Sequence, residues 1–425
     1  MTDSSPLLQE LDRCVACGRC RAVCPTFAAE GEEIAVARGK LKLLQGAENG
    51  ALVYNSALSR LIDNCLGCRL CVESCPQSVR TDELIYAARQ KLRGSLGRKP
   101  VELFLLRYLL PRRGLLMSAA RFVGKLQRLG GWFFGLFRKG SERLSPPQQT
   151  QQALRGIYRW LLPLAGLSPR LIPPTLATQP FSLGRGELLH DAGADAPRYA
   201  LFLGCAIDLA YPEAAEAMVS LAKTAGVTLI SPKQQVCCGL PAYSSGDRRT
   251  AHNLAVANRL AFAGEEFDGI ITACASCASF LREQYPRLIG AESSLANTLT
   301  LQEFLTERRS SLPLRHDPDL KITWHQPCHL SRHLSVELAE PLLKQIGNYI
   351  EMEEKEVCCG GAGSYFAKFP ETSAAIGERK ARNITTSGAD VVATACPACA
   401  MQLSASLARL NADVRVVLLG ELLVD

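Results

Sequence analysis

All eighteen cysteines of this 425-residue chain fall into two kinds of motif, and each kind occurs twice. The first kind is Cys-x2-Cys-x2-Cys-x3-Cys-Pro, at residues 14–25 and again at 65–76. The second kind is a lone cysteine, then Cys-Cys-Gly, then Cys-x2-Cys, at 205–277 and again at 328–399. No cysteine is left for ordinary packing, so we expect the chain to fold around metal clusters held by thiolates.

Length and composition indicate a multidomain protein of the cytoplasm. A chain of 425 residues exceeds what one hydrophobic core usually holds, so we expect two or three domains. The first residues, MTDSSPLLQELD, lack a basic start and an apolar stretch, which predicts no secretory signal. No uninterrupted apolar run reaches about 18 residues, which predicts no transmembrane helix. We therefore expect thiolates in a reducing cytosol rather than disulfides, and leave open peripheral contact with the inner face of the cell membrane.

The first motif kind predicts two [4Fe–4S] clusters in a helical, ferredoxin-like domain over residues 1–100. In the paired arrangement, three sulfurs of one motif bind one cluster and the fourth cysteine binds the other. Zinc is the alternative, although a zinc site needs two cysteine pairs and not this run twice. Residues 34–45 and 52–64 are expected to form helices between the motifs. The predicted ligands are Cys14, Cys17, Cys20 and Cys75 for one cluster, and Cys65, Cys68, Cys71 and Cys24 for the other.

A strongly basic stretch follows. Between Arg89 and Lys139 the chain has thirteen Lys or Arg and one acid, Glu102. The local charge of this stretch therefore exceeds the net charge of +7 of the whole chain. Apolar clusters alternate with single cations over residues 101–137, which predicts short helices divided by Pro111 and by glycines. We assign residues 101–197 to a basic, helical and Pro-rich connecting segment, with a further helix near 152–162. It could contact protein or an anionic membrane surface, whereas nucleic acid is not expected because no known binding fold accompanies the charge.

The second motif kind lies in an internal duplication with an α/β pattern, over residues 198–312 and 313–425. Short apolar strands are expected at 198–205, 227–231 and 268–274, and again at 321–328, 348–353 and 389–396. The cysteines follow strands or open helices, where open α/β sheets bind their ligands. The candidate metal ligands are Cys205, Cys237, Cys238, Cys274 and Cys277 in the first copy, and Cys328, Cys358, Cys359, Cys396 and Cys399 in the second.

Two adjacent cysteines cannot both reach one iron of a simple cube without strain, so each Cys-Cys-Gly site is expected to hold an irregular cluster. Gly239 and Gly360 would permit the turn that follows each pair. One or two further, non-cubane iron–sulfur clusters are therefore predicted. Zinc, one ordinary cubane per copy and a vacant redox-active dithiol are the alternatives. The expected fold class is thus α+β and α/β multidomain: the ferredoxin-like domain, the helical linker and the duplicated α/β cysteine-rich domain.

The motifs and their order carry a family resemblance. The combination of a two-cluster module with two Cys-Cys-Gly domains resembles the iron–sulfur subunit of glycolate oxidase and of related FAD-linked lactate dehydrogenases. The stretches CGRCRAVCPTFAAEGEE and ARGKLKLL are similar to that family's first motif and the segment after it. The resemblance implies an enzyme in which a partner FAD subunit oxidises a 2-hydroxy acid. This chain would relay the electrons to quinone or another carrier.

Two related proteins give alternative functions, because the same Cys-Cys-Gly domains occur in heterodisulfide reductase and in the C subunit of anaerobic glycerol-3-phosphate dehydrogenase. The first of these would make the chain a thiol–disulfide oxidoreductase subunit. Cys396-Pro-Ala-Cys399 is intact here, although it is often degraded in the glycolate enzyme, and the gap from Cys328 to Cys358 is two residues shorter than its counterpart. His329 beside Cys328 is more simply a neighbour than a ligand. No dinucleotide or phosphate loop follows a strand, so no flavin is expected on this chain and no catalytic residue is assigned.

Overall fold

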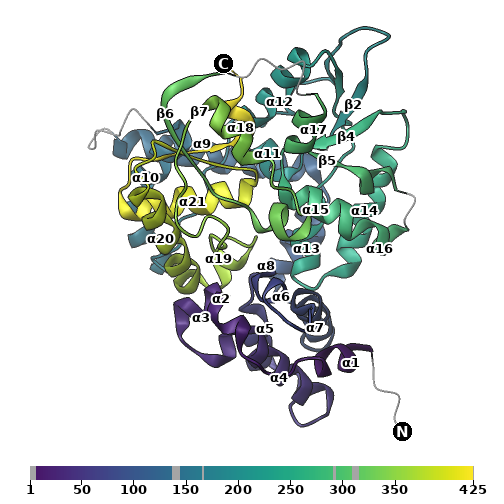
Figure 1. The fold of residues 1–425 in the computed structure, drawn as a ribbon, viewed down its shortest axis with the longest axis vertical. Coiled ribbons are helices and arrows are strands. Elements are labelled where there is room, and N and C mark those ends of the chain that lie inside the picture. The colour runs from purple at the N-terminus through teal and green to yellow at the C-terminus, as the bar shows by residue number, and fades with distance from the viewer. Residues whose placement is uncertain (1–5, 136–143, 165–166, 291–292, 309–314, 425) are drawn as a thin grey trace.

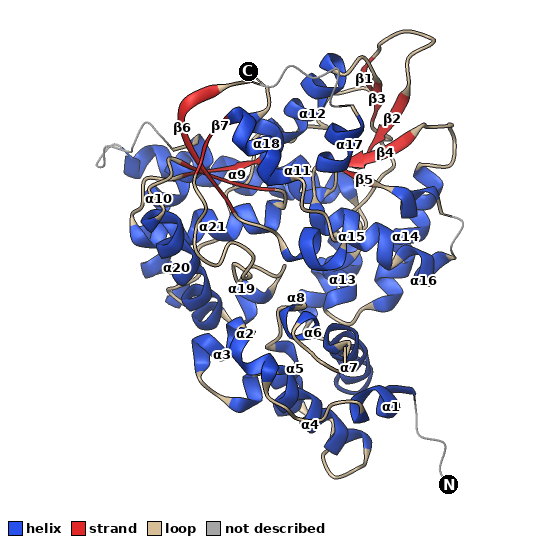
Figure 2. Ribbon diagram, in the orientation of Figure 1, coloured by secondary structure: helices blue, strands red, loops and turns tan. Residues whose placement is uncertain are grey.

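The structure, a computed structural model, describes residues 6–135, 144–164, 167–290, 293–308 and 315–424. A helical N-terminal module lies at one end of the molecule, and two α/β units lie side by side above it (Figures 1 and 2). The predicted combination of a ferredoxin-like module with a duplicated α/β part is confirmed.

The N-terminal module is entirely helical within its described residues. Its elements are α1 (Pro6–Asp12), α2 (Arg19–Val23), α3 (Pro25–Glu30), the 3-10 turn η1 (Glu33–Ala35), α4 (Ala37–Glu48), α5 (Ser56–Asp63), α6 (Leu70–Glu73) and α7 (Thr81–Leu96). α4 and α5 match the two helices expected between the cysteine motifs. Their apolar faces, with Leu44 and Ile62 fully buried, pack against Ile85 and Leu92 of α7 in a small core of their own.

The connecting segment is more regular than its glycines suggest. It contains α8 (Pro100–Leu103), the π-helical turn η2 (Phe104–Leu109), α9 (Arg113–Gly135) and α10 (Pro146–Leu164). The expectation of short helices is wrong beyond Pro111, because α9 runs unbroken for 23 residues. A Cβ at Gly124 would lie 2.6 Å from the carbonyl oxygen of Leu176, and one at Gly130 would lie 3.0 Å from Leu154 of α10. These glycines therefore mark places where other chain segments approach α9, and they do not end the helix.

The first α/β unit has a five-stranded sheet in the order β1-β3-β2-β4-β5. Its strands are β1 (Leu188–His190), β2 (Arg198–Leu201), β3 (Thr228–Ile230), β4 (Gly269–Thr272) and β5 (Leu299–Thr300). Its helices are α11 (Cys205–Ala210), α12 (Pro212–Thr224), α13 (Leu240–Ser244), α14 (Arg248–Ala261), α15 (Ala275–Glu283), α16 (Tyr285–Ile289), η3 (Ser294–Asn297) and α17 (Leu301–Glu307). All pairings are parallel except β1 with β3, so the connecting segment contributes an edge strand before residue 198.

The second unit repeats this arrangement without the extra strand, as a parallel sheet in the order β7-β6-β8-β9. Its strands are β6 (Asp317–Trp324), β7 (Gly347–Tyr349), β8 (Val391–Thr394) and β9 (Arg415–Leu418). Its helices are the π-helical turn η5 (His329–His333), α18 (Ala339–Ile346), α19 (Tyr365–Lys368), α20 (Pro370–Thr386), α21 (Pro397–Leu410) and η6 (Leu419–Leu422). The three strands expected from the sequence are present in each copy.

The two α/β units are fused through a common interior. One continuous set of contacting buried side chains includes Phe202 and Phe280 of the first unit together with Trp324 and Leu403 of the second. The backbone N–H of Ala275 donates to the carbonyl of Ala395 across the boundary, with N and O 2.9 Å apart. The reciprocal bond cannot form, since the residue equivalent to Ala275 is Pro397, which has no N–H. The cysteines that follow β4 and β8 therefore lie beside one another.

Candidate metal centres

The eight cysteines of the N-terminal module line two small cavities. Cys14, Cys17, Cys20 and Cys75 line one of them, and Cys24 lines the other together with Cys65, Cys68 and Cys71. Cys71 also reaches the wall of the first cavity. The fold thus brings the last cysteine of each motif to the first three cysteines of the other motif, which is the arrangement that cross-shared ligand sets require.

The ten cysteines of the α/β units all line one cavity of about 160 Å³ between the two units and the N-terminal module. Their thiols form a continuous series in which each lies within hydrogen-bonding reach of the next. The order is Cys205, Cys237, Cys238, Cys277, Cys274, Cys396, Cys399, Cys359, Cys358 and Cys328. The step from Cys274 to Cys396 crosses between the units. The two Cys-Cys-Gly sites are therefore neighbours in one chamber.

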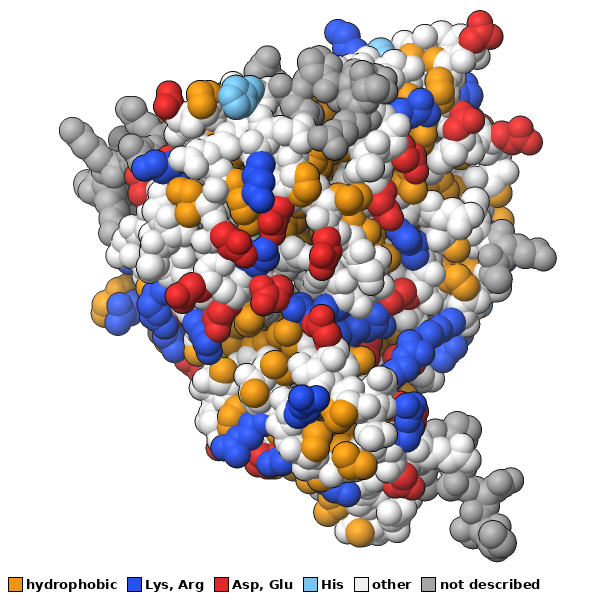
Figure 3. Space-filling model, in the orientation of Figure 1, with side chains coloured by type: hydrophobic (Ala, Val, Ile, Leu, Met, Phe, Trp, Pro, Cys, Tyr) orange, Lys and Arg blue, Asp and Glu red, His pale blue; other side chains and the backbone are white. Residues whose placement is uncertain are grey.

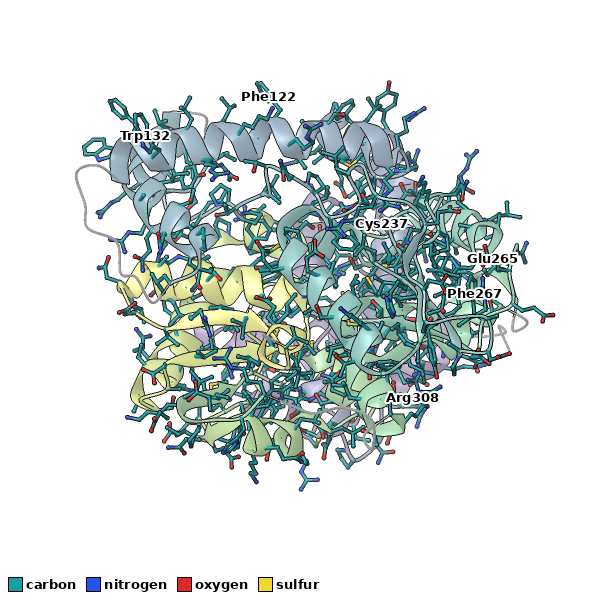
Figure 4. The ribbon with its side chains drawn as sticks, turned by 90° about the horizontal axis from the view of Figure 1, so that it is seen from above. Phe122, Trp132, Cys237, Glu265, Phe267 and Arg308 are labelled. Atoms are coloured by element: carbon teal, nitrogen blue, oxygen red, sulfur yellow. The ribbon has the colours of Figure 1, made fainter. Side chains whose placement is uncertain are left out.

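Local backbone geometry explains how each unit presents five thiols to the chamber. Cys274 and Cys396 are the N-cap residues of α15 and α21, so the partner cysteine three positions on lies within the first helical turn and faces the same way. Gly239 has φ +101° and Gly360 has φ +86°, and a Cβ at Gly360 would lie 3.1 Å from Ile376 and from the carbonyl of Ser373. Glycine is therefore required after each cysteine pair, as the sequence predicted. Cys237 lies in the interior of the molecule (Figure 4).

The electrostatics of the chamber fit a polynuclear metal group. A hydrogen bond with Cys237 and burial raise the pKa of Cys205, and a hydrogen bond with Cys358 and burial raise the pKa of Cys328. Among the described residues that line the chamber, the permanent cations are Arg89 and Lys368. Two cations cannot neutralise ten buried thiolates, so ionised thiols at this density need the positive charge of several metal ions.

The N-terminal module joins the chamber at its second motif. Cys68 packs in one apolar cluster with Cys328 and Cys358, and burial followed by the nearness of Cys358 and Cys328 raises its pKa. Cys65 lines both its own cavity and the chamber. Arg89 fixes this contact, because its guanidinium donates to the carbonyls of Cys65 and of Ser244 at 2.7 and 2.8 Å.

A buried ion-pair junction joins the N-terminal module to both α/β units. Arg69 of the module donates to Glu283 of the first unit at 2.6 Å and to Asp82 at 2.7 Å. Glu283 also contacts Nδ1 of His333, in the second unit, at 2.9 Å. Figure 3 shows basic and acidic side chains gathered along this boundary on one face of the molecule. The junction fixes the module against the chamber wall.

Two buried basic side chains of the second unit were missed in the sequence. Lys380 lies at the position of Asn258 in the first unit and donates to the carbonyl of Glu354, and burial lowers its pKa to about 8 while Cys359 opposes that shift. His325 lies at the position of Phe202, and burial lowers its pKa to about 3. Comparing the two copies position by position would have found both. His329, which the sequence did bring forward, has its Nδ1 3.2 Å from Ser276 Oγ and 3.8 Å from Cys328 Sγ.

Comparison with known families identifies both kinds of domain. Residues 10–79 match the 4Fe-4S dicluster domain family, and residues 199–282 and 322–404 each match the cysteine-rich domain family. These matches cover the N-terminal module and the two units that share the chamber.

The probable glycolate oxidase iron-sulfur subunit of Bacillus subtilis is among the relatives that match over nearly the whole chain; it is 29% identical across 98% of this chain and 94% of its own length. The chain contains both kinds of iron–sulfur protein domain, in the order expected from the sequence, and is similar to a glycolate oxidase iron–sulfur subunit. Lactate utilization protein A of an Exiguobacterium species is 28% identical over 53% of this chain and 97% of its own length. One subunit of the fumarate reductase (CoM/CoB) of Methanothermobacter marburgensis is 33% identical over 57% of this chain and 49% of its own length. The predicted resemblance is confirmed.

Proposed function

We propose that the chain is the electron-transfer subunit of an FAD-dependent 2-hydroxyacid dehydrogenase that acts on glycolate or lactate. A partner subunit would bind the flavin and oxidise the substrate, and this chain would carry the electrons to quinone or another carrier. The observation that carries the proposal is the unbroken succession of cysteines from the N-terminal cavities into the ten-thiol chamber. The substrate class is taken from the names of two relatives of this chain, the glycolate oxidase iron-sulfur subunit and lactate utilization protein A.

In this proposal the eight N-terminal cysteines hold two [4Fe–4S] clusters with the cross-shared ligand sets, and each Cys-Cys-Gly site holds a further, non-cubane cluster. Thiolate ligands supply the outer coordination, and the clusters supply one-electron chemistry. The chain's own residues fix the spacing. Because electron transfer slows steeply with distance, the contact of Cys68 with Cys328 and Cys358 favours entry from the N-terminal module into the second site. The neighbouring thiols of Cys396 and Cys274 then favour passage into the first.

Anaerobic copurification with the flavin partner tests this proposal. Glycolate and both lactate enantiomers should be compared for dye reduction, and metal analysis should give about 16 irons per chain if all four sites are filled, against about 8 for two cubanes alone. Colourless protein that carries zinc would refute the proposal.

Two equivalent variants test the order of transfer. In Cys238→Ser, substrate should still reduce the flavin, the cubanes and the second site, while electron delivery to the final acceptor is lost. In Cys359→Ser, delivery to the final acceptor should be lost as well, and in addition the first site should stay oxidised. If Cys359→Ser left reduction of the first site intact, the proposed order would be wrong. If either variant prevented flavin reduction, the division of labour between the subunits would be wrong.

The chamber itself favours one second candidate, a thiol–disulfide oxidoreductase like heterodisulfide reductase. Both Cys-Cys-Gly sites face the same space of about 160 Å³, so a small disulfide could meet both at once. Reduction of a disulfide by the anaerobically reduced protein, at a rate that Cys238→Ser abolishes, would support this function. Acceptor reduction without any disulfide turnover would support the dehydrogenase assignment instead.

We also propose that α9 contacts an anionic membrane surface. The inner face of α9 carries small or polar residues such as Ala120 and Gln127, whereas Phe122 and Trp132 on the outer face are each 65% exposed and point away from the body (Figure 4). The helix carries four cations and no acid; Lys125 and Arg128 are exposed, Arg121 is partly buried, and Arg113 pairs with Asp208 at 3.0 Å. Exposed apolar groups beside cations are the pattern of a helix that lies on anionic lipid. Among the described residues, no helix is long and apolar enough to cross a membrane.

Sedimentation with phosphatidylglycerol vesicles tests the membrane contact. Replacing Phe122 and Trp132 together by Ser should lower the fraction bound by at least about tenfold, because both would otherwise bury apolar area. Leu260→Ser, at a 68% exposed leucine of α14, is the matched control and should leave binding unchanged. Equal loss in both variants would refute the assignment to α9.

A further inference from the structure

The second Cys-Cys-Gly site contains a buried side chain whose polar atoms lack a well-formed hydrogen bond within the described part of the chain. His325 follows β6 directly and is 1% exposed. Neither of its ring nitrogens makes a hydrogen bond of good geometry among the described residues, although the backbone of Lys355 lies near enough to raise its pKa slightly against the effect of burial. Since an imidazole always carries at least one N–H or lone pair that seeks a partner, burial in this state is costly unless a group absent from the chain binds it.

The ring is placed against two thiols of the same site. A ring nitrogen of His325 and the sulfur atoms of Cys359 and Cys399 all lie within 4.8 Å of one another. The backbone holds this position, because the N–H of His325 donates to the carbonyl of Ala393 at 2.9 Å and so continues the pairing of β6 with β8. Two thiolates and an imidazole at this spacing are a donor set suited to a metal ion.

The equivalent position in the first unit has no such capacity. Phe202 stands there, and its ring stacks on Phe262 with centroids 5.8 Å apart. The two other histidines near the chamber are already engaged: His329 with Ser276 at 3.2 Å and His333 with Glu283 at 2.9 Å. Of these three histidines, His325 is therefore the one whose ring needs a partner that a metal ion could provide.

We propose that His325 supplies an imidazole nitrogen ligand to an iron of the second Cys-Cys-Gly cluster, which makes that site a mixed thiolate and imidazole site beside an all-thiolate first site. This inference rests on the proposed function, because it requires an iron–sulfur group at the second site. The five cysteines found in the sequence are then an incomplete ligand set for that site. Replacement of thiolate donors by imidazole raises the potential of iron–sulfur groups, so the two duplicated sites would differ in potential.

Pulsed EPR of the full chain, purified anaerobically, tests the assignment. The protein is prepared with natural and with ¹⁵N-labelled histidine, in the redox state in which the second site is paramagnetic. We expect a histidine nitrogen coupling that changes with the isotope in the wild-type chain. It should be lost in His325→Phe, which copies the first unit, and in His325→Gln, and kept in the matched control His329→Ala. Loss of the coupling should come with a lower reduction potential of the second site.

Three results would overturn the proposal. The first is a wild-type signal from the second site without any histidine coupling, a result that needs no variant to fold. The second is a coupling that persists in His325→Phe but disappears in His329→Ala. In both cases an iron content near 16 per chain would leave the proposed function standing. The third is an iron content near 8, with the α/β units empty or zinc-loaded, which would overturn the proposed function and this inference together.

Discussion

Replacing Glu283 by Gln should loosen the attachment of the N-terminal module to the two α/β units. Burial opposes ionisation of Glu283, but His333 and Arg69 outweigh it and hold its pKa at about 2, against 4.5 ordinarily. A shift of this size corresponds to about 3 kcal/mol of stabilisation, and we reduce this to about 2 kcal/mol because the side chain is 23% exposed. Since the folded-state pKa is depressed, this contribution is complete above pH 4.5 and is lost as the pH falls toward 2. At pH 7 the glutamine variant should lose all of it.

Anaerobic urea unfolding at pH 7 measures this loss. Far-UV circular dichroism reports loss of secondary structure in the whole chain, and cluster absorbance reports loss of the iron–sulfur clusters. Glu265→Gln is the matched control, because Glu265 pairs with Arg198 at the surface, where both side chains are 47% exposed. The control should change the free energy of unfolding by less than about 0.5 kcal/mol. The argument fails if the two variants lose equal stability.

Two further predictions concern pH and cluster ligation. Burial raises the pKa of Glu421 to about 7, so the folded chain binds this proton more tightly and stability falls as the pH rises from 4.5 to 7. In anaerobic thermal melts, Glu421→Gln should therefore gain about 3 kcal/mol over the wild type at pH 8.5 and almost nothing near pH 4. A difference that stays constant with pH would refute this. Cys14→Ser combined with Cys75→Ser should remove about four irons, because both ligands serve one cluster, whereas Cys14→Ser combined with Cys24→Ser should remove about eight. Equal iron loss in the two double variants would disprove the cross-shared ligand sets.

Cysteine spacing predicted the two kinds of domain and their order, because each motif constrains the local backbone around its cysteines. The strands that precede Cys205 and Cys328 were visible as apolar runs. The glycines of α9 were misread as breaks, since the sequence does not reveal which segment approaches Gly124. Strand β1 was missed because it is only three residues long and pairs only with β3. No local sequence pattern indicates that pairing.

Each candidate site was predicted from the sequence, but the proximity of the two Cys-Cys-Gly sites in one chamber was not. A duplication indicates two similar sites and does not say whether they face each other, which here depends on the shared core and the contact of Cys274 with Cys396. Lys380 and His325 were missed for a related reason. Each is an ordinary residue on its own and becomes informative only beside its counterpart in the other copy.

The shared interior of the α/β units determines where this chain can be divided. A fragment that ended near residue 312 would contain one complete cysteine-rich sequence, yet it would expose half of a hydrophobic core and open the chamber to water and oxygen. A cut near residue 98, by contrast, would separate a module with a core of its own. The smallest stable fragment that carries a Cys-Cys-Gly site is therefore the pair of α/β units. Where proteins of this kind lose or gain domains, we expect the two units to be kept or lost together.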